Sequence, residues 1–188
     1  MSPRSIFGVT VSPVAAWCLL HPERFAEGLG VLPRAWTVFA ARAHGRDVRK
    51  GDLLALTVRQ EHPRHARLAA LEVRAVMDTT LPTHPEPYAA LCGRVVAVAT
   101  LTGSTQRARR LDGSVDPWRR EDLRRALGCH DRDGAPRWWW GLGDVIALPA
   151  PVECQGDAGL WSLPREVSVA VMDQVRAAEA ARAQEARQ

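Results

Sequence analysis

The sequence predicts an α+β domain in which a mixed β-barrel is flanked by helices. Apolar runs of strand length recur along the chain, and the most continuous of them is Cys92 to Leu101. Helical patterns separate only some of these runs, so the order is not the alternating strand–helix repeat of a parallel sheet. With 188 residues, of which 46% are hydrophobic and 24% charged, the chain can form one folded core.

The first half of the chain contains three predicted strands and two predicted helices. Phe7 to Val11 has the alternation of a strand, and Ser12 followed by Pro13 is typical of a helix start. The helix that follows, VAAWCLLHPERFAEGL, is broken or kinked at Pro22. The remaining elements are strands at Trp36 to Ala41 and at LLALTVR after Gly51-Asp52, and a helix from Arg64 to Met77 with apolar positions at Leu68, Leu71 and Ala75.

The second half is predicted to return to strands and to end in a helix. A proline-rich connection, Thr79 to Tyr88, leads to the apolar strand already described. Further strand-like sequence covers Trp138 to Val152, and GLWSLP closes the core. The final helix begins near Pro164-Arg165, and it should dock on the body through Val167, Val171 and Val175.

An arginine-rich insertion divides the predicted barrel domain, which spans residues 1–164. Residues 103–137 carry nine arginines and six acidic residues, and Asp116-Pro117 within them predicts a helix start. Residues 165–188 form the C-terminal helix and tail, and the part beyond Ala177 is expected to be solvated helix or frayed chain.

Composition and motifs favour a cytosolic protein without a metal or cofactor. No apolar run approaches a membrane span, and the N-terminus lacks a signal-peptide pattern. The four cysteines include no C-x-x-C pair, and no glycine-rich phosphate loop is present. His62 and His65 can be read as a weak metal pair or, preferably, as surface residues at a helix start. The net charge of +4 permits nucleic-acid binding without requiring it.

The segment WWWGLGDVIALPAPVECQGDAGLW, Trp138 to Trp161, resembles the C-terminal part of ASCH domains, which are PUA-like barrels. Those proteins carry a Trp-x-Leu-x-Asp strand, then Leu-x-x-Pro-Val and a Gly-Leu-Trp turn. CGRVVAVATL, FGVTVSPVAAWCLL and KGDLLALTV resemble earlier elements of the family. The resemblance implies a PUA-like mixed β-barrel over most of residues 6–164.

The resemblance also implies a cleft beside the first helix, lined in the family by a Gly-x-Lys-x-x-Glu-x-Arg stretch. The matching residues here run from His21 to Glu27. Arg24 stands near the lysine position and Glu27 near the glutamate, whereas the glycine and the lysine are absent. Some small ASCH proteins suggest an amidohydrolase activity on acetylated cytidine with that lysine as nucleophile. Arginine cannot act in its place, because it stays protonated.

The favoured hypothesis is therefore a binding module for RNA or another nucleic acid, or for a modified nucleotide. Its basic cleft would use charge from several arginines and one lysine, Trp36 as a stacking surface, and the insertion along the phosphates. The predicted binding residues are Arg24, Arg34, Trp36, Arg42, Arg49, Lys50, Arg107, Arg109 and Arg110.

Two other classes of function remain open. One is a hydrolase acting on a modified nucleoside or on RNA, with Glu23 or Glu27 as general base and Lys50 in support. The other is a protein-interaction adaptor that uses the insertion and the C-terminal helix.

The tryptophans admit more than one interpretation. Trp17 is more typical of core than of a stacking platform. Alternation along a strand would turn Trp138 and Trp140 to one side and Trp139 to the other, where the Trp139 indole can stack on a base or cover the insertion.

Overall fold

The computed structural model describes residues 6–21, 36–40, 50–77, 81–105, 138–157 and 160–187. Within these ranges the side chains of residues 36–40, 76–77, 103–105 and 138–141 are not described. The elements in chain order are β1 (Ile6–Val11), α1 (Pro13–Leu20), β2 (Trp36–Ala40), β3 (Leu53–Val58), α3 (Pro63–Met77), α4 (Glu86–Ala89), β4 (Arg94–Thr105), β5 (Trp138–Glu153), β6 (Leu160–Trp161) and α6 (Arg165–Glu185).

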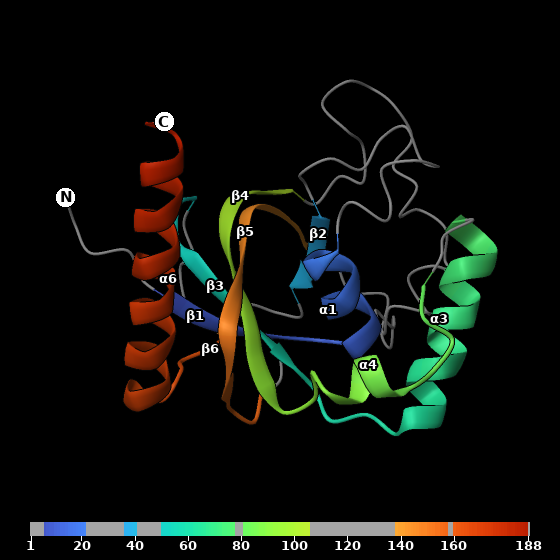
Figure 1. Cartoon of the computed structure of the whole chain (residues 1–188). Coiled ribbons are helices and arrows are strands. Elements are labelled where there is room, and N and C mark those ends of the chain that lie inside the picture. The colour runs from blue at the N-terminus through green and yellow to red at the C-terminus, as the bar shows by residue number, and fades with distance from the viewer. Residues whose placement is uncertain are drawn as a thin grey trace.

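The strands form one mixed sheet in the order β2-β5-β4-β3-β1-β6 (Figure 1). β1 and β3 are parallel, with Ile6 opposite Leu53 and Val11 opposite Val58. The other four pairs of neighbouring strands are antiparallel. This mixture of helices with a mainly antiparallel sheet confirms the predicted α+β class. Within the described residues β2 and β6 are the two edges of an open sheet, so the predicted closure into a barrel is not observed.

The sheet is covered on both faces, and this explains its most apolar strand. All six residues of β3 are buried, as expected for a central strand that meets helices on both sides. Figure 1 shows α6 on one face and α1, α3 and α4 on the other. Two hydrophobic clusters fill the two interfaces. The cluster under α1 includes Leu54, Leu56 and Leu142, and the cluster under α6 includes Ala55, Val98 and Ile146.

The start of α1 follows the predicted capping pattern. The hydroxyl of Ser12 accepts a hydrogen bond from the backbone N–H of Ala15 at 3.2 Å, and Pro13 occupies the first turn. The helix ends at Leu20, before the predicted break at Pro22. Trp17 is buried, with its indole centroid 4.3 Å from the His21 ring and 6.3 Å from the Tyr88 ring, so it belongs to the core as predicted.

The predicted helix of residues 64–77 is present as α3, but its large apolar side chains do not face the core. Ala66, Ala70 and Val73 are buried against α1 and α4. Leu68 and Leu71 lie on the opposite side, and they are 49% and 40% exposed. The small residues of α3 therefore make the packing contacts, and the two leucines face outward.

The C-terminal helix matches its prediction closely. α6 begins at Arg165, and Val167, Val171 and Val175 are buried against the sheet. Its last turns, through Glu185, remain helical and exposed. β4 extends to Thr105 and so includes the first three residues of the predicted arginine-rich insertion. The short helix α4 overlaps the end of the predicted proline-rich connection. The rest of the insertion lies outside the described residues.

Candidate functional site

One predicted binding residue, Trp36, lies in a row of paired residues that crosses β2, β5 and β4 and ends beside a second one, Lys50. Trp36 in β2 pairs with Leu142 in β5, which pairs with Leu101 in β4. The backbone N–H of Gly51 donates to the carbonyl of Leu101 at 2.8 Å, and Leu101 donates to Asp52 at 2.9 Å. The row therefore joins Trp36 to the residue that follows Lys50, across three strand spacings or about 14 Å.

We call this part of the sheet, where β3 begins, the Lys50 end. Two long segments of the sequence connect strand termini at the Lys50 end. Residues 41–49 connect the last residue of β2 with Lys50, and residues 106–137 connect Thr105 in β4 with Trp138 in β5. Ala40 pairs with Trp138, and Thr105 pairs with Trp139, so these strand termini are neighbours. Both segments themselves lie outside the described residues.

The sequence concentrates positive charge in these two segments. Residues 41–49 contain three arginines and one aspartate, and residues 106–137 contain nine arginines and six acidic residues. Apart from these segments and Lys50, the chain has 12 basic and 14 acidic residues. The net positive charge of the sequence is thus concentrated in these two segments and Lys50, while the remainder of the sequence is slightly acidic.

Lys50 is exposed at the turn before β3. Gly51 beside it has φ +96°, a left-handed conformation that glycine adopts without a steric cost. The Lys50 side chain makes no ion pair or hydrogen bond with another described residue. Its ammonium group is therefore not neutralised by a carboxylate in the part of the chain that the structure describes.

Sequence reasoning missed one feature of the Lys50 end, a bulge in β5 at Asp144. Thr100 pairs with Gly143 and Val98 with Ile146, so β5 contains one extra residue here. Asp144 is exposed and has φ +48°, a conformation in which aspartate is more frequent than most side chains. A Cβ on Gly143 would lie 2.6 Å from the Thr102 side chain, so glycine permits the close approach of β4. The one sequence feature that could have indicated this bulge is the Gly143-Asp144 pair inside a predicted strand.

Lys50 is the one predicted site residue whose side chain lies within the described part of the chain. Trp36 is described by its backbone alone, as the first residue of β2. The remaining candidates lie outside the described residues, namely Glu23, Arg24, Glu27, Arg34, Arg42, Arg49, Arg107, Arg109 and Arg110. The side chains of Trp138, Trp139 and Trp140 are likewise not described.

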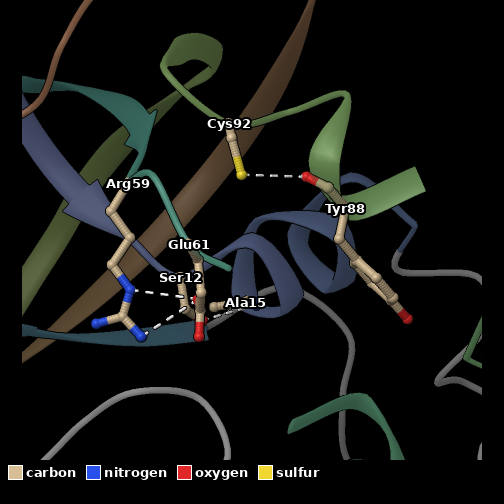
Figure 2. A network of polar contacts seen from close by, with 6 residues as sticks. All are labelled: Ser12, Ala15, Arg59, Glu61, Tyr88 and Cys92. Carbon is tan, nitrogen blue, oxygen red and sulfur yellow. Dashed lines mark hydrogen bonds and ion pairs between the residues drawn. The ribbon is translucent and has the colours of Figure 1, made fainter. Parts of the chain in front are cut away.

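A second polar cluster lies at the opposite end of the sheet, where β1 and β3 both finish (Figure 2). Arg59 donates to the carboxylate of Glu61 through Nε and Nη2, both at 3.4 Å. The Glu61 side chain is 13% exposed. Its carboxylate is therefore engaged by a cation of the protein itself.

The thiol of Cys92 in the same view is not suited to nucleophilic chemistry. It donates a hydrogen bond to the carbonyl of Tyr88 at 3.5 Å. Burial raises the pKa of Cys92, and the Glu61 carboxylate raises it further, although the Glu61 backbone N–H and Arg59 act in the other direction. Burial also raises the pKa values of Cys18 and Cys154. All three described thiols are thus less ionised than a free cysteine at neutral pH.

The two histidines at the start of α3 do not form part of a metal centre that the structure describes. His62 and His65 are exposed, and their ring centroids are 5.7 Å apart. His62 Nδ1 accepts a hydrogen bond from the Arg64 backbone, which caps the helix start. In the described part of the chain, no group of three His, Cys, Asp or Glu side chains is arranged to hold a metal ion.

Comparison with known proteins identified no relative of this chain. No family model matches the chain, and no curated protein matches it. Within the described ranges, none of the helices combines the length and apolar character that a membrane span requires.

Proposed function

We propose that the protein binds nucleic acid, preferably RNA, at the Lys50 end of the sheet. The observation that carries the proposal is the convergence of strand termini there. The exposed Lys50 lies at the same end of the sheet as the described strand termini that flank both arginine-rich segments, Ala40, Thr105 and Trp138. Phosphate contacts supply much of the affinity of such interfaces, and lysine and arginine side chains make many of them.

Arginine is the chemically appropriate cation for this task. Lys50 is the only lysine, and the other 24 basic residues are arginines. A guanidinium group binds phosphate with two parallel hydrogen bonds and stacks on bases, which an ammonium group does not do. An edge-strand tryptophan such as Trp36 would add a stacking platform beside the phosphate contacts.

The same proposal includes a PUA-like barrel of the ASCH type in a cytosolic protein. Its support is that the four segments with this resemblance form neighbouring strands of one sheet. FGVTV lies in β1, LLALTV in β3, RVVAVATL in β4 and WWWGLGDVIALPAP in β5. Strand pairing brings these segments together in the order β5-β4-β3-β1.

The test is a binding titration with fluorescent single-stranded RNA and DNA oligomers, carried out at several salt concentrations. The proposal expects binding at low salt and a linear fall of log K with log salt, with a slope of about −0.7 for each phosphate contacted. Binding that ignores added salt, or no binding at low salt, would contradict it.

A matched pair of variants locates the interface. Lys50→Ala should weaken binding to all sequences alike and reduce the salt slope by about one phosphate contact. Arg165→Ala removes an exposed cation from the first residue of α6, which lies at the lower end of the helix in Figure 1, and should leave affinity unchanged. Equal losses in the two variants would argue for non-specific attraction to net charge.

A further inference from the structure

α3 carries an outer surface that the core does not use. Ala66, Ala70 and Val73 face α1 and α4, and each is at most 2% exposed. Leu68 and Leu71 project from the opposite side of the helix, because residues at these positions lie about half a turn away from the buried ones. Of the described residues, they are two of the three large hydrophobic side chains that are well exposed.

Basic residues flank these leucines along the same surface. Arg64 precedes Leu68 by four residues, and Arg67 precedes Leu71 by four, so each arginine lies one turn from a leucine. Both arginines are exposed, and neither forms an ion pair with a described residue. We call Arg64, Arg67, Leu68, Leu71 and the exposed Ala75 the outer face of α3.

The arginines oppose the stability of the helix that carries them. The first turn of α3 contains no acidic residue, and it does contain Arg64. A positive charge near a helix N-terminus is unfavourable, because it meets the positive end of the helix dipole. Local helix stability therefore does not account for this placement, and the two exposed guanidinium groups are complementary to an anionic surface.

We infer that the outer face of α3 binds an acidic amphipathic helix of a partner protein. Two leucines in the centre and two arginines towards one end match a helix that presents apolar residues at i, i+3/i+4 and i+7 with carboxylates beside them. Nucleic acid would gain nothing from the leucines, because bases stack on aromatic rings and guanidinium planes. A bilayer would require a broader apolar surface than two leucines provide.

The inference can be tested with a phage-displayed library of helical peptides selected against the nuclease-treated full-length protein. Enriched peptides should combine carboxylates with apolar residues at helical spacing. Leu68→Ser/Leu71→Ser should weaken the selected peptides by about tenfold or more. Val169→Ser, which alters a 54% exposed side chain on α6, should leave their affinity unchanged.

Charge reversal separates a binding role from a structural one. Arg64→Glu/Arg67→Glu should abolish binding of the acidic peptides and restore binding of peptides whose carboxylates are replaced by lysine. The same variant should be at least as stable to urea as the parent, because glutamate is favourable near a helix N-terminus. A loss of peptide binding caused by unfolding is thereby distinguished from a loss of the interface.

Three outcomes would overturn the inference. These are failure to enrich any peptide, enrichment of peptides that bind the leucine and arginine variants as well as the parent, and leucine-dependent sedimentation with vesicles of phosphatidylserine and phosphatidylcholine. The last outcome would assign the outer face of α3 to a lipid surface.

Discussion

The side-chain amide of Gln174 in α6 binds both backbone groups of Ala150 in β5. Its carbonyl oxygen accepts from the Ala150 N–H at 2.9 Å, and its amino group donates to the Ala150 carbonyl at 2.8 Å. From Ala147 to Val152, β5 takes five steps while β4 takes two between Ala97 and Val95. β5 therefore bulges by three extra residues here, and the Gln174 amide binds the backbone of Ala150, which lies between two prolines in this bulge.

Loss of this contact should destabilise the attachment of α6 to the sheet. Gln174→Ala is expected to lower the free energy of unfolding by about 1 kcal/mol, since two partly exposed hydrogen bonds are removed. Gln184→Ala, on the exposed final turns of the same helix, is the control and should change little. Urea denaturation measures both. Equal effects of the two variants would mean that the amide contributes nothing specific.

A second prediction concerns the contact between Gly8 in β1 and Trp161 in β6. A Cβ at Gly8 would fall within 3 Å of several atoms of the indole ring, which also donates to the Thr10 hydroxyl at 3.3 Å. Gly8→Ala should therefore cost about 1–3 kcal/mol of stability through overpacking. In a Trp161→Leu background the same change should cost less, because the ring is gone. A double-mutant cycle without such coupling would refute this explanation.

A third prediction tests the backbone at Asp144. Because φ is +48° there, Asp144→Gly and Asp144→Asn should alter stability by no more than about 0.5 kcal/mol. Asp144→Val should cost about 1–2 kcal/mol, since a β-branched side chain is poorly tolerated in this conformation. Thermal unfolding of the three variants gives the ranking. If valine proves as well tolerated as glycine, the left-handed conformation is not imposed by the fold.

A fourth prediction concerns stability at alkaline pH. Burial raises the pKa of Cys18 in the folded state, so the folded protein holds this proton more tightly than the unfolded chain does. The resulting stability is complete below the unfolded thiol pKa, about 8.5, and it declines as pH rises above that value. Cys18→Ala should lower the free energy of unfolding at pH 7, because it leaves a cavity. Between about pH 8 and 10, however, the free energy of unfolding of this variant should fall less than that of the parent. Urea denaturation of both proteins at each pH measures this difference. An identical dependence of the free energy of unfolding on pH in the two proteins would contradict the prediction.

Much of the fold could be predicted because its signals are local. The Ser12-Pro13 start of α1, the buried valines of α6 and five of the six strands follow from capping chemistry and hydrophobic spacing. The outward orientation of Leu68 and Leu71 could not be predicted, because periodicity shows that a helix has two faces but not which one packs. That choice depends on the space beside α1 and α4, where alanines fit.

The candidate site was less accessible to sequence reasoning. Only the strand order places Trp36 in the same row as Gly51, the residue that follows Lys50, and strand order is not encoded locally. The bulge at Asp144 likewise depends on the register between β4 and β5. By contrast, the concentration of arginines in residues 103–137 was visible in composition alone.

The central claim is that nucleic acid lies at the Lys50 end of the sheet, and photo-crosslinking tests it most directly. The protein would be irradiated with RNA containing 4-thiouridine, and the attached peptides identified by mass spectrometry. Crosslinks should fall in the β2 and Lys50 regions and in the part of β5 that begins at Trp138. Crosslinks confined to α3 or α6, with none at the Lys50 end, would contradict the account.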